Sequence, residues 1–176
     1  MSDFRDLFGG MGGPEDDRRR PSDELGPEPE NRGYRALNEK EVRVVNVYEG
    51  VYDTPNGGQA NSTTFVLLRD NRGREFKIFV LRDVAIAISY GLENDPPDRP
   101  FTHDLMRTMI ERLGAKVERI TIDDLWRDTF YAKIGLIQNG ESIEIDARPS
   151  DAIAIALRFR APIYVAEAVL EASQPD

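Results

Sequence analysis

The chain has 176 residues, no cysteine and a formal net charge of −9 at pH 7. The lack of cysteine excludes disulfides, thiol nucleophiles and cysteine-based zinc sites. The acidic balance argues against a passive nucleic-acid binder with a basic stripe, but not against an enzyme whose metal ions neutralise phosphate. No apolar run reaches the roughly 18 residues of a membrane span, and a signal-peptide core is missing, so we expect a cytoplasmic protein without membrane contact.

The first part of the chain differs in composition from the rest. Residues 1 to 38 are rich in proline, glycine and charges of both signs, and they hold few apolar residues. Such a segment buries too little surface to offset its ordering entropy. We therefore predict a disordered tail over 1–38, a folded domain over 39–172 and a disordered end over 173–176. The FRDLF segment at 4–8 is a candidate docking motif for a protein partner, and its alternative is an ordinary tail.

Strand and helix patterns alternate along the domain. The segments VRVVNVYEGVYD, TTFVLLRD and EFKIFV read as strands, with a polar, glycine-rich PNGGQANS loop after the first and an RG turn before the third. A buried Ala/Ile-rich helix follows at DVAIAIS. Further on, AKVERITIDDL and TFYAKIGLI read as two more strands. We expect Asp123 and Asp124 to end the former, and Trp126 either to pack or to stack on a base.

The segment FTHDLMRTMIERLGA carries the signals of an amphipathic helix. Thr102 is the expected N-cap, Asp104 complements the helix dipole and Gly114 ends the helix. His103, the one histidine of the chain, lies at the edge of an apolar stripe. That stripe comprises Leu105, Met106, Met109, Ile110 and Leu113.

The run IEIDARPSDAIAIALRFR, residues 143–160, concentrates charge at a predicted strand-to-helix turn. Alternation predicts one buried face with Ile143 and Ile145 and one charged face with Asp146 and Arg148. Pro149 fits the first helical position, where its missing N–H costs nothing. A buried helix should therefore begin here.

An internal repeat is predicted by laying residues 65–88 over 132–155, a shift of 67 positions. Gly73 falls on Gly140, and AIAI at 85–88 falls on AIAI at 152–155. Each copy reads as strand, tight turn, strand and buried helix. We therefore predict an α+β fold in which duplicated strand–strand–helix units form a mixed or antiparallel sheet packed with buried helices.

RPFTHDL, TFYAKI, IDARPSDAIAIALR and APIYV, in this order, resemble the bifunctional nuclease family over roughly residues 41–171. The resemblance implies a compact α+β fold, a homodimer and nuclease activity on RNA and DNA. The family pattern also leads us to expect an acidic residue near DVAIAIS, a place that Asp83 would fill.

The candidate site residues follow from these motifs together. Catalytic candidates are His103, Asp104, Asp146, Arg148 and Asp151. Substrate-binding candidates are Arg99, Lys133 and Ser150. Asp146 and Asp151 are the candidate ligands of a divalent metal, Mg²⁺ or Mn²⁺. Within this set His103 is the candidate general base and Arg148 the candidate phosphate clamp.

Each candidate also has a purely structural alternative. His103 suits a buried structural histidine, Asp104 a dipole partner, and Arg148 an internal salt bridge with Asp146 or Asp151. The competing hypothesis is a non-catalytic dimeric binding or regulatory module. Geometry separates the two, because His103 and Asp151 more than about 12 Å apart, or both sealed from solvent, would make a shared site implausible.

Overall fold

The computed structural model describes residues 38–52, 61–94 and 97–174. Within these ranges the chain forms seven strands and four helices, which confirms the predicted α+β class. In chain order they are β1 (Glu39–Tyr52), β2 (Asn61–Asp70), β3 (Glu75–Val80), α1 (Arg82–Glu93), α2 (Thr102–Arg112), β4 (Ala115–Trp126), β5 (Thr129–Gln138), β6 (Glu141–Ala147), α3 (Pro149–Phe159), β7 (Ile163–Ala166) and α4 (Glu167–Ala172). The predicted tail, its FRDLF motif and most of the PNGGQANS loop lie outside the described residues.

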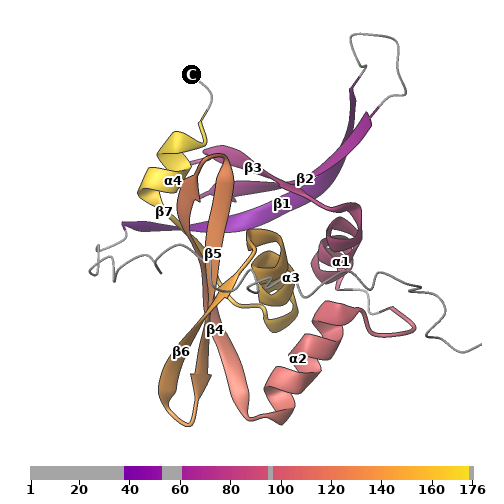
Figure 1. Cartoon of the computed structure of the whole chain (residues 1–176), viewed down its shortest axis with the longest axis vertical. Coiled ribbons are helices and arrows are strands. Elements are labelled where there is room, and N and C mark those ends of the chain that lie inside the picture. Colours follow the sequence, from indigo (N-terminus) through magenta and orange to yellow (C-terminus); the bar gives the residue numbers. More distant parts are fainter. Residues whose placement is uncertain (1–37, 53–60, 95–96, 175–176) are drawn as a thin grey trace, which may run out of the picture. The chain divides into compact units, whose positions relative to one another are not determined.

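All seven strands belong to one mixed sheet with the order β3-β2-β1-β7-β4-β5-β6. Every neighbouring pair is antiparallel except β4 and β7, which are parallel. The short β7 therefore joins a β1–β3 half to a β4–β6 half (Figure 1). The two edge strands of the sheet are β3 and β6.

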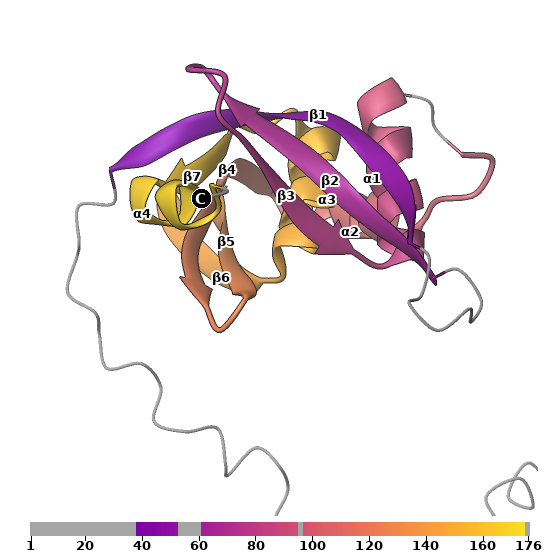
Figure 2. The same cartoon turned by 90° about the horizontal axis from the view of Figure 1, so that it is seen from above.

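Helix α3 lies between the two halves of the sheet, beneath the arch of β1–β3 (Figure 2). Its central residues are fully buried, as their apolar character on every side predicts. Helices α1 and α2 pack against α3, and Phe76 of β3 meets Phe130 of β5 with ring centroids 6.3 Å apart. The largest fully buried side chains are Leu68, Phe76, Ile88, Ile120, Ile122, Ile153, Ile155 and Leu170. Both predicted units thus contribute to one hydrophobic core.

The two halves repeat the same local geometry. The residues before α1 and α3, Leu81 and Arg148, have almost equal φ and ψ, −68°/146° and −66°/140°. Both helices end in a left-handed residue, Asn94 and Arg160, each with φ 53°. This agrees with the predicted unit of strand, turn, strand and helix. An origin by duplication stays a prediction.

The hairpin signals identify two turns and miss a third. Gly73 of the predicted RG turn has φ 86° and lies between the antiparallel strands β2 and β3. Asn139 and Gly140 have φ of 53° and 84° and join β5 to β6, as the NG signal predicts. Asp123 and Asp124, however, do not end their strand, which continues to Trp126 through an irregularity in its register. The chain turns instead at residues 127 and 128, both of which have positive φ. That earlier prediction was wrong because an RD turn carries no glycine or asparagine signal.

Two further expectations are corrected by the structure. Helix α2 begins at Thr102 itself, and the cap residue is Phe101, whose N–H donates to a carboxylate oxygen of Asp104 at 2.9 Å. Ile143 and Ile145 are not buried, and Ile145 is 45% exposed. Because β6 is an edge strand, no further strand covers its outer side.

None of the described helices is long and apolar enough to cross a membrane.

Candidate active site

The start of α3 places three of the candidate residues, Arg148, Ser150 and Asp151, in one turn. Arg148 is the extended N-cap residue, Pro149 occupies the first helical turn, and Asp151 is its acidic residue. The positive end of the helix dipole and the unpaired amides of a first turn favour a carboxylate there. The chain therefore holds Asp151 at a defined position beside α2.

The carboxylate of Asp151 joins α3 to α2. Its Oδ1 lies 3.1 Å from Nε2 of His103, and its Oδ2 accepts a 2.7 Å hydrogen bond from Nε of Arg148. The side chain of His103 is 9% exposed and that of Asp151 is 24% exposed, whereas Arg148 extends into solvent. The two groups are close together, and Asp151 is open to water although His103 is buried, so neither condition against a shared site applies.

The imidazole of His103 has a second ring nitrogen to offer. Asp151 lies at Nε2 of the ring. Among the described residues no protein group forms a hydrogen bond with Nδ1. Burial of His103 in the first turn of α2 confirms part of the structural alternative. The pairing with a carboxylate, however, also orients the ring as a general base requires.

Asp104 points to a different neighbour from His103, although the two are adjacent in α2. Its Oδ1 accepts a 2.5 Å hydrogen bond from Nε of Arg158, a side chain only 5% exposed. Burial by itself raises the pKa of Asp104, but the hydrogen bonds from Arg158 and the Phe101 backbone outweigh it, so the pKa lies below 3.8. Asp104 therefore binds α2 to α3 and does not face the His103–Asp151 pair.

Arg158, in the last turn of α3, is not among the candidate site residues. In the structure its Nη1 donates to the carbonyl oxygens of Ala87 and Ala154, at 3.1 and 2.9 Å. One guanidinium thus connects α1, α2 and α3. The sequence signal that could have identified Arg158 is its position seven residues after Asp151, which places both on the same face of α3.

Asp146 lies on the other side of the sheet from this cluster. It is the cross-strand partner of Lys133, which alternates with the buried Ala132 and Ile134 of β5. Lys133 is 3.5 Å from both Asp123 and Glu144. Burial tends to lower the pKa of Lys133, but these two carboxylates raise it above its usual value. Alternation in the strand therefore separates Asp146 and Lys133 from the side on which α3 packs.

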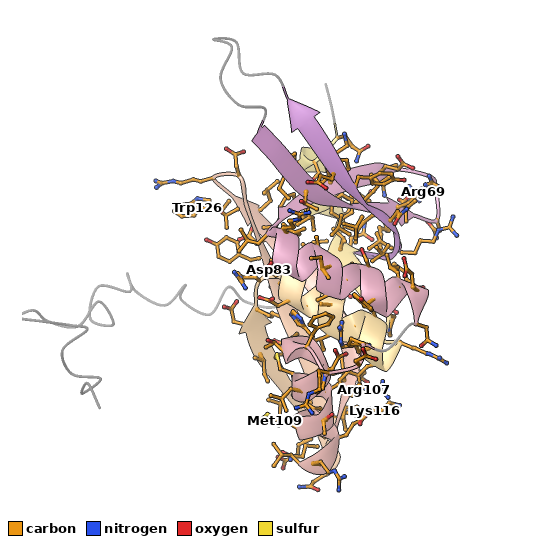
Figure 3. The ribbon with its side chains drawn as sticks, turned by 90° about the vertical axis from the view of Figure 1, so that its right-hand side faces the viewer. Arg69, Asp83, Arg107, Met109, Lys116 and Trp126 are labelled. Atoms are coloured by element: carbon orange, nitrogen blue, oxygen red, sulfur yellow. The ribbon has the colours of Figure 1, made fainter. Side chains whose placement is uncertain are left out.

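The remaining candidates occupy the margins of the site. Arg99 is exposed in the loop before α2, and Ser150 is half-buried in the first turn of α3. Asp83 is exposed in the corresponding turn of α1 (Figure 3). Within the ranges that the structure describes, no three or more His, Cys, Asp or Glu side chains gather as a metal site.

Comparison with known proteins identifies the family of this chain. The model of the bifunctional nuclease domain matches residues 66–176, which include α2, the turn before α3 and α3 itself. The chain belongs to the bifunctional nuclease domain family.

Relatives of this family occur in bacteria and plants. An uncharacterized protein of Mycobacterium tuberculosis is 42% identical over 113 residues, covering 64% of this chain and 67% of its own length. Bifunctional nuclease 1 of Oryza sativa subsp. indica is 34% identical over 91 residues, covering 50% of this chain and 28% of its own. Bifunctional nuclease 2 of Arabidopsis thaliana is 26% identical over 123 residues, covering 65% and 37%. The match thus spans 28% and 37% of the lengths of these two plant proteins.

Proposed function

We propose that this protein hydrolyses phosphodiester bonds of RNA or DNA at the His103–Asp151 pair. The observation that carries the proposal is the position of Asp151, whose two oxygens contact Nε2 of His103 and Nε of Arg148. A base oriented by a carboxylate, beside an exposed arginine, matches what attack of water on a phosphate requires. Membership of the bifunctional nuclease domain family supports the same reaction class.

In the proposed reaction His103 accepts a proton at Nδ1 from the attacking water. The water oxygen forms a bond to phosphorus, the bond from phosphorus to the leaving ester oxygen breaks, and that oxygen takes a proton from solvent. Asp151 keeps the ring oriented and stabilises the imidazolium that forms. Arg148 is 66% exposed, so its guanidinium can reach the phosphate oxygens on which charge develops.

A divalent ion, Mg²⁺ or Mn²⁺, is part of the proposal. Mg²⁺ is commonly bound by one or two carboxylates together with substrate phosphates, a donor set that Asp151 and a bound strand would complete. Such an ion would neutralise phosphate charge on a chain whose net charge is −9. Asp146, the second expected ligand, lies on the opposite face of the sheet. Replacing each carboxylate separately therefore tests which of the two is required for cleavage.

The test is cleavage of labelled single-stranded RNA, single-stranded DNA and duplex DNA with Mg²⁺, Mn²⁺ or EDTA. Wild-type protein is run beside Asp151→Asn and a matched control, Asp146→Asn, which removes the same charge elsewhere. We expect metal-dependent cleavage that Asp151→Asn abolishes and Asp146→Asn retains. Loss in both variants would mean that cleavage requires both carboxylates, and it would contradict a site restricted to the His103–Asp151 pair.

Equal cleavage by wild type and Asp151→Asn would place the activity elsewhere or in a contaminant. No cleavage of any strand would favour the other hypothesis, a binding or regulatory module in which Arg148 and Asp151 only fix the turn. That hypothesis would explain why both carboxylate oxygens of Asp151 contact side chains of the same protein.

The homodimer implied by the family resemblance is also retained as a proposal. The apolar stripe of α2 is exposed except at Ile110, with Leu105 at 53% and Met109 at 54%. A two-fold contact between copies of α2 would bury the same stripe on both protomers, as an isologous interface does. Met109 lies on the opposite edge of α2 from Arg107 (Figure 3), so such a dimer leaves the other edge accessible.

A further inference from the structure

A basic hollow of about 560 Å³ lies where α2 ends and β4 begins, beside the end of α3. Four cationic side chains line it, against one carboxylate, that of Glu111. The four are Arg107, Lys116, Arg158 and Arg160. On a chain with nine more negative than positive charges, such a local excess of cations is the opposite of what average composition would produce. It favours an anionic ligand.

Arg158 gives the hollow a fixed donor. The side chain is 5% exposed, with Nε engaged by Asp104 and Nη1 by two backbone carbonyls. Nη2 has no protein acceptor among the described residues. Because a buried N–H without a partner is costly, an acceptor supplied by a ligand would satisfy it.

The surrounding cations are held less tightly and surround this donor. Arg107 is bound through Nε to Glu111 at 2.9 Å, with its guanidinium carbon 6.0 Å from the ring centroid of Phe159. Lys116 is exposed and has no salt bridge within the described part of the chain. Figure 3 shows Arg107 and Lys116 on one edge of the α2 region. Together with Arg158 they offer charge for more than one oxygen of a phosphate.

The hollow and the His103–Asp151 pair lie along one seam between α2 and α3. On α2, His103 and Arg107 are one turn apart on one face, with Cβ atoms about 5–6 Å apart in a regular helix. On α3, Asp151 and Arg158 are seven residues apart on one face, roughly 10 Å along the axis. The ion pair between Asp104 and Arg158 holds the two helices together along this seam.

We propose that this hollow binds a backbone phosphate of the same nucleic-acid strand whose cleaved bond is held at His103 and Asp151. The inference rests on the proposed function for the identity of the ligand, and it adds a substrate-binding site at the opposite end of α3 from Asp151. A single strand follows such a seam more readily than a duplex, since it can bend between helices. The site therefore predicts a preference for single-stranded RNA or DNA.

The test measures binding of full-length protein to a fluorescent single-stranded 12-mer in EDTA, as a function of NaCl. The variant Lys116→Gln/Arg160→Gln is compared with Arg72→Gln/Lys77→Gln, which removes one lysine and one arginine from the β2–β3 hairpin. We expect Lys116→Gln/Arg160→Gln to bind roughly threefold to tenfold more weakly than wild type. Its binding should also depend less steeply on salt, because fewer phosphate contacts release fewer counterions. The control pair should bind as wild type does. Melting curves confirm that both pairs are folded.

An equal loss in both variants would mean that net charge alone governs binding, and it would overturn the assignment. So would unchanged binding in the first pair. Binding of a mononucleotide is measured in parallel. If the double substitution weakens binding of the mononucleotide but not of the strand, the hollow is a site for a small phosphate ligand instead. Cleavage assays distinguish the two proposals: activity lost in Asp151→Asn with binding unaffected in Lys116→Gln/Arg160→Gln retains the nuclease and refutes the hollow.

Discussion

Nε2 of His103 in α2 and Oδ1 of Asp151 in α3 lie 3.1 Å apart, although 48 positions separate the two residues in the chain. The side-chain pair joins the first turns of two helices, and Arg148 binds the other oxygen of the same carboxylate at 2.7 Å. This relationship is what turns two separate sequence motifs, THDL and RPSDA, into one candidate site.

The variant His103→Ala should lower kcat for strand cleavage by roughly 10²–10⁴-fold, the range for loss of a general base. The truncation leaves space where the ring stood, so added imidazole should restore part of the rate. Steady-state kinetics with and without imidazole provide the measurement, and a melting curve provides the check on folding. A folded His103→Ala protein with the kcat of the wild type would remove His103 from the mechanism.

Asp104→Asn should destabilise the fold by about 3 kcal/mol at pH 7, the lower end of the range for breaking a buried ion pair, since Asp104 is itself partly exposed. The folded pKa of Asp104 lies below its unfolded value of 3.8. Its carboxylate therefore stabilises the fold fully above pH 3.8, and the contribution is lost as pH falls through the folded pKa. The difference between wild type and variant should shrink below pH 3.8.

Urea unfolding at pH 7 and at pH 3 measures that difference. Glu111→Gln is the matched control, since it breaks an exposed pair with Arg107 and should cost under about 0.5 kcal/mol. A gap between wild type and Asp104→Asn that stays constant with pH would show that the carboxylate charge is not what Arg158 requires.

Gly91→Ala tests how closely α1 approaches α3. A Cβ at Gly91 would lie 3.1 Å from Cβ of Leu157 and 3.5 Å from a guanidinium nitrogen of Arg158. Strain of about 1–3 kcal/mol should exceed the gain of about 1 kcal/mol in helix propensity, because Cβ of Leu157 moves only with its backbone. Calorimetry should show a lower melting temperature.

Gly50→Ala serves as the control for this substitution. Its nearest neighbours would lie at 3.8 and 4.0 Å, which is ordinary contact. We expect its stability to be equal to that of the wild type or slightly higher. A more stable Gly91→Ala protein would mean that α1 and α3 can separate at little cost.

Leu105→Glu/Met109→Glu should dissociate the proposed homodimer without lowering the melting temperature of the monomer, since both side chains are largely exposed. Sedimentation velocity at micromolar concentration gives the mass of each species. Ile86→Glu, on the exposed side of α1, should leave the association state unchanged. A monomeric wild-type protein, or a double variant that still dimerises, would contradict the role of the α2 stripe.

Local patterns in the sequence predicted much of the fold. The NG turn at Asn139 and Gly140, Pro149 in the first turn of α3 and the buried faces of β2, β3 and β5 follow from backbone preferences and from alternation. Such features depend on neighbours within a few positions. Asp123 and Asp124 were misassigned because the pairing of β4 with β5 outweighs their low strand propensity.

The sequence by itself determined the element types except β7 and α4, the chemical kinds of the site residues and the turn from which α3 starts. Only the tertiary structure decided which of these residues meet. Packing of α2 on α3 brings His103 to Asp151 and Asp104 to Arg158, and it leaves the α2 stripe exposed. Alternation along β6 places Asp146 away from α3. Contacts between residues distant in the chain depend on how faces pack together, and periodicity gives each face but not its partner.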